Sequence, residues 1–227
     1  MPKLKAVFFD VDGVLLDSLP PHLAICKELN TRYGLGLSIP TAEEFKQIAR
    51  SGIPISPMTA FFRAVGFPQG AAVRGDLEYR SRFTTSYRIP VFKGVREMLL
   101  RLSGAGLPLG IVTANTLANI QGPLGHSFAL FHPDCVFAHD TTEGLTKAEA
   151  IVRGARALGI RPSTLLFVGD QPSDRCAAAE AGARFLGVTY GWGLAEGAAG
   201  HPLAGSPDEI TAWVTRTLAQ APDTGIT

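Results

Sequence analysis

Five short apolar runs, separated by longer stretches with helical periodicity, constrain the fold of this chain more than any other feature. The runs cover residues 4–9, 109–112, 135–138, 165–168 and 184–188. Short apolar runs without polar alternation are typical of strands buried on both faces, and the helical stretches between them are the crossovers that parallel strands require. The sequence therefore predicts an α/β fold, a doubly wound, Rossmann-like parallel sheet with helices on both faces.

The connection between the first two runs is too long for a single crossover. About 95 residues separate these runs, whereas a crossover needs only a dozen or so. Residues 17–89 show helical periodicity, with glycine and proline marking the loops, and no convincing strand. We therefore expect two domains, an α/β core of residues 1–16 and 90–227 and an inserted helical domain of residues 17–89.

Charge and hydropathy exclude several classes of partner. The 21 lysines and arginines nearly balance the 20 aspartates and glutamates, so the net charge of +1 provides no field to hold a nucleic acid. Asp10 and Asp12 interrupt the apolar N-terminal run before a signal-peptide core could form, and no run approaches the ~20 apolar residues of a spanning helix. We expect a cytoplasmic protein, a monomer or homodimer, without nucleic-acid or membrane partners.

Two acids follow the first apolar run directly, in the segment Phe8-Phe9-Asp10-Val11-Asp12-Gly13. Ligand and catalytic groups of open parallel sheets gather where strands end. Two carboxylates leaving a buried strand together repel each other and are costly to desolvate unless a cation or proton compensates. A bound metal would resolve this conflict, and the alternative is a polar turn after an edge strand.

A second acid pair, Asp170 and Asp174, follows another apolar run and precedes a helical stretch. Carboxylates suit Mg²⁺, which binds through a few of them together with water and phosphate oxygens. Taken alone, this pair also fits a helix cap and a solvated acid. Thr113 and Asn115 follow the run 109–112, and Lys147 precedes a further helical stretch. Hydroxyl and ammonium groups of this kind can hold phosphoryl oxygens.

In their order along the chain, these motifs resemble those of the haloacid dehalogenase-like hydrolases, in the phosphoglycolate-phosphatase-like branch with a helical cap. The four matching motifs are Asp10-Val11-Asp12-Gly13-Val14, Thr113, Lys147, and Gly169-Asp170 through Asp174, and the segment Gly187-Val188-Thr189-Tyr190-Gly191-Trp192-Gly193 also resembles that branch. The resemblance covers nearly the whole chain. It implies that residues 17–89 form the cap over a catalytic core.

The resemblance implies a role for each matching residue. Asp10 is the nucleophile that becomes an aspartyl-phosphate, and Asp12 is the general acid and base. Thr113 and Lys147 hold the phosphoryl group.

It also implies the metal site. Mg²⁺ is bound by Asp10, Asp170 and the backbone carbonyl of Asp12, and Asp174 supports the metal directly or through water.

The resemblance implies Mg²⁺-dependent hydrolysis of a phosphate ester. A small phosphorylated metabolite is the expected substrate, rather than a phosphoprotein, because a closing cap must exclude bulk water. A phosphomutase would keep every motif and differ in what the cap holds, so that alternative stays open. A dehalogenase would need neither Asp12 nor Asp170, and a non-enzymatic phospho-receiver domain would need no cap. Arg50 and Ser51 are candidate residues for selecting the substrate.

Overall fold

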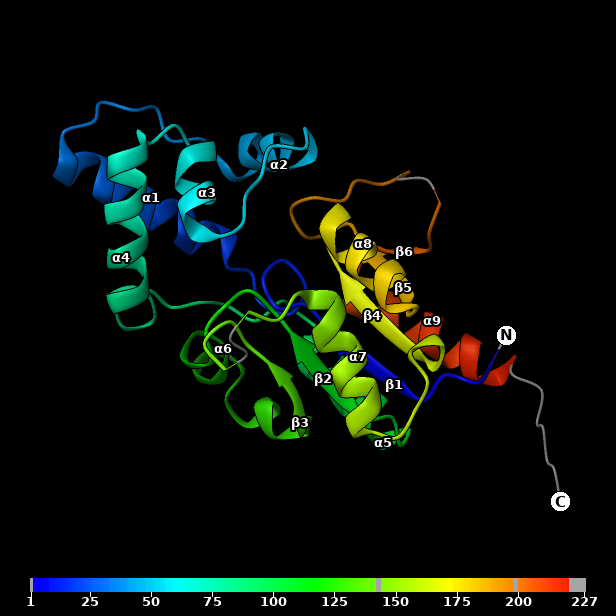
Figure 1. Ribbon diagram of the computed structural model, residues 1–227. Coiled ribbons are helices and arrows are strands. Elements are labelled where there is room, and N and C mark those ends of the chain that lie inside the picture. The colour runs from blue at the N-terminus through cyan, green and yellow to red at the C-terminus, as the bar shows by residue number, and fades with distance from the viewer. Residues whose placement is uncertain (1, 142–143, 198–199, 221–227) are drawn as a thin grey trace, which may run out of the picture.

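The computed structural model describes residues 2–141, 144–197 and 200–220. Within these residues the strands are β1 (Ala6–Phe9), β2 (Leu109–Val112), β3 (Phe131–Phe137), β4 (Leu165–Gly169), β5 (Arg184–Val188) and β6 (Leu203–Ala204). They form one parallel sheet of six described strands in the order β3-β2-β1-β4-β5-β6 (Figure 1). The predicted doubly wound α/β fold is confirmed.

The strands reproduce the apolar runs most closely in the middle of the sheet. β2 and β5 have the predicted bounds, and β1 and β4 differ from theirs by one or two residues. At one edge, β3 begins four residues before the predicted run. The sequence did not reveal this first part of the strand, because its exposed residues Pro133 and Asp134 break the apolar pattern. β6 was not predicted, since its two residues are too few to form a recognisable run.

Helices cover both faces of this sheet. They are α5 (Val95–Gly104), α6 (Leu117–Leu124), α7 (Lys147–Ala157), α8 (Pro172–Ala181) and α9 (Pro207–Ala219), with 3₁₀ turns η1 (Gly125–Leu130) and η2 (Pro162–Thr164). Alternate residues of β1 enter different apolar clusters: Phe9 packs in the cluster that includes Met98 of α5, and Phe8 in the one that includes Ile151 of α7. This alternation explains why β1 is apolar at every position.

The C-terminal helix, α9, has a capped start. Ser206 accepts a hydrogen bond from the backbone N–H of Glu209 at 3.3 Å, and Pro207 is the first helical residue. These features cap the helix and preset its first backbone angle.

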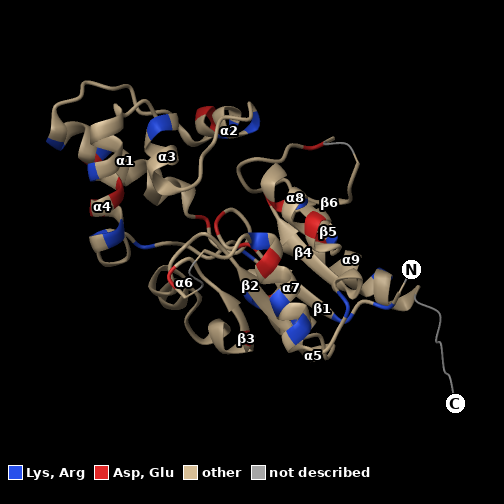
Figure 2. Cartoon of the chain, in the orientation of Figure 1, with Lys and Arg blue, Asp and Glu red and all other residues tan. Residues whose placement is uncertain are grey.

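Residues between β1 and α5 form a group of helices beyond one end of the sheet (Figure 1). These are α1 (Leu19–Tyr33), α2 (Ala42–Arg50), α3 (Met58–Ala64) and α4 (Gln69–Ser86), and from residue 19 to residue 86 every position is described and none lies in a strand. We call residues 17–89 the helical segment. Figure 2 shows charges of both signs in it, and Arg82 of α4 forms an ion pair with Glu28 of α1 at 2.8 Å.

The chain enters and leaves the helical segment along two adjacent backbone stretches. The N–H of Asp17 donates to the carbonyl of Pro90 at 2.9 Å, and the N–H of Phe92 donates to the carbonyl of Leu15 at 3.1 Å. Leu16 and Val91 form an antiparallel bridge between these two bonds. The helical segment is therefore tied to the sheet by a short two-stranded connection next to the end of β1.

Among the described residues, every helix is too short or too polar to span a membrane.

Candidate active site

Three buried carboxylates converge at the carboxyl edge of the sheet. Asp10 follows β1 and Asp170 follows β4, and these strands are neighbours in register, with Phe9 opposite Val168. Asp174 joins them from the first turn of α8. One carboxylate oxygen from each of the three aspartates lies within 4.8 Å of the others. The sequence predicted two separate acid pairs, and the structure brings one member of the first pair together with both members of the second.

Glycines let the backbone approach these acids closely. A Cβ atom on Gly13 would lie 2.4 Å from Oδ2 of Asp170, and one on Gly191 would lie 2.5 Å from Cβ of the same aspartate. Gly13 also has a φ of +80°, in the region that side-chain-bearing residues rarely adopt. The backbone after β1 and after β5 can therefore pack against Asp170 only because glycines stand at these two positions.

Lys147 places its charge between two of the carboxylates. It is the first residue of α7, whose start is fixed by reciprocal hydrogen bonds between Thr146 and Glu149. Its Nζ lies 2.9 Å from Oδ2 of Asp10 and 2.6 Å from Oδ1 of Asp174. The predicted lysine therefore lies in contact with the predicted nucleophile.

Burial and mutual repulsion act strongly on these charges. Burial raises the pKa of Asp10 to about 7, against the opposing effect of Lys147. Burial, Asp174 and Asp10 raise the pKa of Asp170 well above its usual range. Although burial alone would lower the pKa of Lys147, the two carboxylates beside it hold that pKa above its ordinary value. One lysine does not compensate three buried acids, so the group calls for a further cation.

The donor set of this group fits a divalent cation. Oδ2 of Asp170 accepts hydrogen bonds from the backbone N–H of Trp192 at 2.7 Å and from Nε2 of Gln171 at 3.0 Å. Oδ1 of Asp170 is buried and has no hydrogen-bond partner among the described residues. Three carboxylates with one oxygen each within 4.8 Å of the others provide the oxygen ligands that Mg²⁺ favours. The residues present therefore fit the predicted metal.

The carboxylate of Asp12 does not belong to this group of three and is held by hydrogen bonds. Its Oδ1 accepts from the hydroxyl of Ser18, and its Oδ2 accepts from Nδ2 of Asn115 at 2.8 Å. Asp10 and Asp12, two positions apart after one strand, thus have different surroundings. This separation is compatible with the different chemical roles predicted for them.

The hydrogen bonds around Asp12 continue into the helical segment. Asn115 accepts at 2.8 Å from Nδ2 of Asn119, which also lies 3.5 Å from the hydroxyl of Tyr79 in α4. That hydroxyl is 3.1 Å from Nε2 of His22 in α1. Sequence reasoning missed Asn119, Tyr79 and His22 as part of the site. Their only signal was a polar group at a buried helical position.

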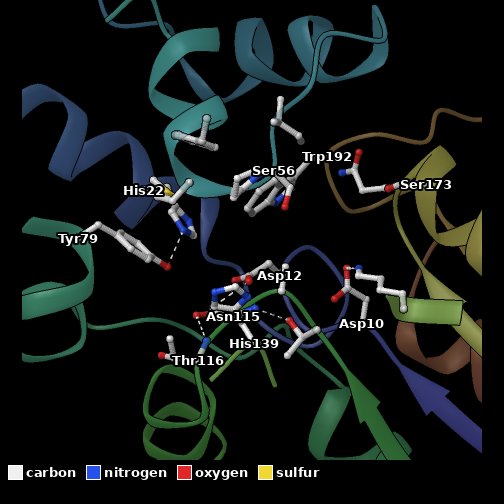
Figure 3. A pocket seen from close by; sticks show the side chains of 18 of the residues that line it. Asp10, Asp12, His22, Ser56, Tyr79, Asn115, Thr116, His139, Ser173 and Trp192 are labelled. Atoms are coloured by element: carbon white, nitrogen blue, oxygen red, sulfur yellow. Dashed lines mark hydrogen bonds and ion pairs between the residues drawn. The ribbon is translucent and has the colours of Figure 1, made fainter. Parts of the chain in front are cut away.

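Asp10 and Asp12 line a cavity of about 180 Å³ between the sheet edge and the helical segment (Figure 3). Thr113, Lys147 and Asp170 also line it, so the structure brings most of the predicted residues to one cavity. The lining residues from the helical segment are His22, Ile55, Ser56, Pro57, Met58, Phe61, Asp76, Tyr79 and Arg80.

The two residues suggested as substrate selectors do not line this cavity. Arg50 donates instead to the backbone carbonyl of Leu194 at 3.3 Å. Ser51 is exposed and donates to the carbonyl of Ile48 at 2.7 Å. The loop beginning at Ile55, a few residues further on, takes the position over the cavity.

Comparison with known proteins decides the family. The model of the haloacid dehalogenase-like hydrolase family matches residues 7–188, which include the four motifs and the whole helical segment. The chain belongs to this family. As a haloacid dehalogenase-like hydrolase it resembles curated phosphatases over most of its length, and it is a phosphoric monoester hydrolase.

Two relatives illustrate that resemblance. N-acetylmuramic acid 6-phosphate phosphatase of Pseudomonas aeruginosa is 29% identical over 198 residues, which are 84% of this hydrolase and 84% of the relative. Phosphoglycolate phosphatase of Chromobacterium violaceum is 32% identical over 83% of this chain and 86% of its own.

Solved structures show the same fold. A haloacid dehalogenase-like family protein from Streptococcus pneumoniae matches with a TM-score of 0.74 and 23% identity, over 92% of this chain and 98% of its own. A protein described as a predicted phosphoglycolate phosphatase from Haemophilus somnus matches with a TM-score of 0.75 and 20% identity, over 94% and 99% of the two chains. At these identities the match concerns the fold alone.

Proposed function

We propose that this hydrolase is a Mg²⁺-dependent phosphatase that removes phosphate from a small phosphorylated metabolite through an aspartyl-phosphate on Asp10. The observation that carries the proposal is the contact of Asp10 with Lys147, 2.9 Å apart, beside two more buried carboxylates. A phosphate monoester is attacked slowly because nucleophile and phosphoryl group are both anionic. A buried carboxylate beside fixed cations is arranged to overcome that repulsion.

In this proposal, Asp10 attacks the phosphorus atom and the bond to the ester oxygen breaks. Asp12, in its protonated form, gives its proton to the departing alkoxide. Ser18 and Asn115 hold both oxygens of Asp12 by hydrogen bonds and so fix the direction of that transfer. The alcohol leaves, and the phosphoryl group stays on Asp10.

The second half of the proposed reaction regenerates the enzyme. Asp12, now ionised, takes a proton from water, which attacks the phosphorus atom of the aspartyl-phosphate. Inorganic phosphate leaves and Asp10 is restored as a carboxylate. Lys147 stabilises the phosphoryl oxygens in both steps, and Thr113, which lines the same cavity, donates its hydroxyl to them.

The metal in this proposal is held by Asp10, Asp170 and the backbone carbonyl of Asp12, with Asp174 supporting the site. When bound, Mg²⁺ supplies positive charge that offsets the anionic phosphoryl oxygens. The unpartnered Oδ1 of Asp170 supports this assignment.

We further propose that residues 17–89 act as a cap over a core of residues 1–16 and 90–227. The paired backbone stretches at Leu16 and Val91 are the place where such a cap would be hinged. A cavity of about 180 Å³ under the cap favours a small metabolite over a phosphoprotein. Two of the curated relatives are named as phosphatases of N-acetylmuramic acid 6-phosphate and of phosphoglycolate.

Release of inorganic phosphate from a panel of phosphate esters, measured with Mg²⁺ and after chelation, tests the proposal. The panel should include sugar phosphates, phosphoglycolate, nucleotides and pyrophosphate. We expect Mg²⁺-dependent release from at least one small ester and labelled phosphate on Asp10. Conversion of a sugar phosphate to its isomer without phosphate release would indicate a phosphomutase instead. Unchanged activity after exhaustive chelation would remove the metal from the mechanism.

A further inference from the structure

A closed ring of hydrogen bonds joins Asp12 to the helical segment. In order around the ring, its members are Asp12, Ser18, His22, Tyr79, Asn119 and Asn115. Ser18, His22 and Tyr79 belong to the helical segment, and every member except Asp12 is buried. Figure 3 shows the hydroxyl of Tyr79 directed at His22 and the side chain of Asn115 beside Asp12. The ring thus connects both oxygens of the Asp12 carboxylate to side chains of the helical segment.

The direction of donation around this ring is set by His22. A carbonyl oxygen only accepts hydrogen bonds, so the contact with the carbonyl of Ser18 requires a proton on Nδ1 of His22. Burial lowers the pKa of His22, so the imidazole is neutral at neutral pH and carries no second proton. Its Nε2 atom must therefore accept, and the hydroxyl of Tyr79 donates to it at 3.1 Å.

The same reasoning fixes the two amides between Tyr79 and Asp12. Because the proton of Tyr79 is directed at the imidazole, its oxygen accepts one hydrogen of Nδ2 of Asn119, at 3.5 Å. The other hydrogen of that Nδ2 goes to Oδ1 of Asn115, at 2.8 Å. Since Oδ1 of Asn115 also accepts from the backbone N–H of Thr116, the opposite end of this amide faces Asp12 and donates to it at 2.8 Å. Each donor from Tyr79 to Asp12 therefore has its acceptor.

Packing within the helical segment fixes the position of the Tyr79 hydroxyl. The phenol ring stacks on His22 and also packs against Phe83, with centroid distances of 5.3 and 4.4 Å. Without the hydroxyl, the buried Nε2 of His22 would lose its donor and one hydrogen of the buried Asn119 amide would lose its acceptor. Unpartnered buried groups are unfavourable, so both side chains would turn toward other partners. Asn119 would then no longer hold Asn115 in the same place.

We propose that Tyr79 is a positioning residue, which holds the carboxylate of Asp12 in the orientation for proton transfer by acting through Asn119 and Asn115. This inference rests on the proposed function, in which Asp12 protonates the leaving oxygen, and it adds a residue of the helical segment to that step. Tyr79 itself exchanges no proton with the substrate. Its removal should therefore matter only where the leaving group needs a proton.

Steady-state kinetics of Tyr79→Phe on two kinds of ester test the inference. The alkoxide that leaves from an alkyl phosphate is strongly basic and needs a proton, whereas p-nitrophenolate is weakly basic and leaves without one. For the alkyl phosphate that the wild type hydrolyses best, kcat/KM should fall about 10- to 100-fold, a part of the 10²- to 10⁴-fold effect of general acid–base catalysis. For p-nitrophenyl phosphate it should stay close to the wild-type value, which would also show that the variant is folded.

Two further variants separate positioning from a structural role. Tyr33→Phe is the matched control, because this hydroxyl of α1 donates to Glu78 at 3.2 Å and lies outside the ring, and it should keep wild-type kcat/KM on both esters. Asn119→Leu keeps the volume of another ring member and should show the same selective loss as Tyr79→Phe. Equal losses on both esters in Tyr79→Phe and Asn119→Leu would overturn the inference, and so would an undiminished kcat/KM for the alkyl phosphate.

A double-mutant cycle shows whether Tyr79 acts through Asp12. Added to Asp12→Asn, Tyr79→Phe should cost nothing further on the alkyl phosphate, since the group that it positions is already lost. A further loss as large as that in the wild type would mean that Tyr79 acts on the substrate itself, and would overturn the inference alone. Wild-type activity in Asp12→Asn, or no turnover of any ester by the wild type, would instead overturn the proposed function and the inference with it.

Discussion

The Nζ atom of Lys147 lies 2.9 Å from Oδ2 of Asp10, which joins the first residue of α7 to the end of β1. The same atom lies 2.6 Å from Oδ1 of Asp174. Two buried carboxylates thus share one ammonium group. A buried carboxylate needs such a partner to stay ionised, so the proposed nucleophile depends on a residue from a distant part of the chain.

Replacing Lys147 with methionine should lower kcat/KM by roughly 10²- to 10³-fold, the effect of removing one preorganised charge from the reacting group. The variant keeps the length of the side chain and loses its charge. Arg153→Met, at an exposed position of the same helix, should keep wild-type activity. Initial rates of phosphate release measure the activity of both variants. Wild-type rates in Lys147→Met would show that the contact has no part in the reaction.

Asp10→Asn and Asp12→Asn should fail in different ways. Asp10→Asn removes the nucleophile and should abolish turnover. Asp12→Asn keeps the nucleophile but loses proton transfer, which costs on the order of 10²- to 10⁴-fold in rate. If hydrolysis slows more than formation, the aspartyl-phosphate accumulates and is detected by mass spectrometry of the quenched protein. Full activity in Asp10→Asn would refute covalent catalysis at this residue.

Mg²⁺ should raise the thermal stability of the wild type, because it binds the three crowded carboxylates of the folded state. A ligand at a hundred times its dissociation constant adds about 2.7 kcal/mol to the free energy of unfolding. Asp170→Asn should lose most of this gain, and Asp134→Asn, at an exposed acid, should keep it. Melting curves with Mg²⁺ and with EDTA provide the measurement. An undiminished gain in Asp170→Asn would place the metal elsewhere.

The buried ring of His22 should make stability depend on pH. Burial lowers its pKa in the folded protein, against the opposing charge of Asp12, while in the unfolded chain the ring has its ordinary pKa of 6.5. Below that pH the unfolded state binds a proton that the folded state does not. The free energy of unfolding should therefore fall as the pH drops from 6.5 toward the folded pKa.

Urea denaturation at a series of pH values between 7 and 5 measures this dependence. His22→Gln should reduce the loss of stability on acidification, whereas His126→Gln, at an exposed position, should leave it unchanged. Identical slopes in the wild type and His22→Gln would mean that another group causes the pH dependence.

Much of the sheet could be predicted because its central strands are buried on both faces. β1, β2, β4 and β5 lie at or near the apolar runs, since every residue of β1, β2 and β4 must avoid water. The edge strands, β3 and β6, were harder to predict from the sequence. Exposed residues interrupt the first half of β3, and β6 is only two residues long. Partial exposure removes the pattern on which such predictions depend.

The sequence by itself placed Asp10 and Asp170 at the carboxyl edge of the sheet, because each directly follows a buried parallel strand. Only the tertiary structure showed that β1 and β4 are neighbours, which brings the two acids together. The sequence did not reveal how His22 and Tyr79 reach the surroundings of Asp12. Those contacts depend on how α1 and α4 pack over the sheet edge, and no periodicity encodes the partner of a buried polar side chain. For the same reason, only the tertiary structure placed Trp192 in the lining of the cavity and left Arg50 outside it.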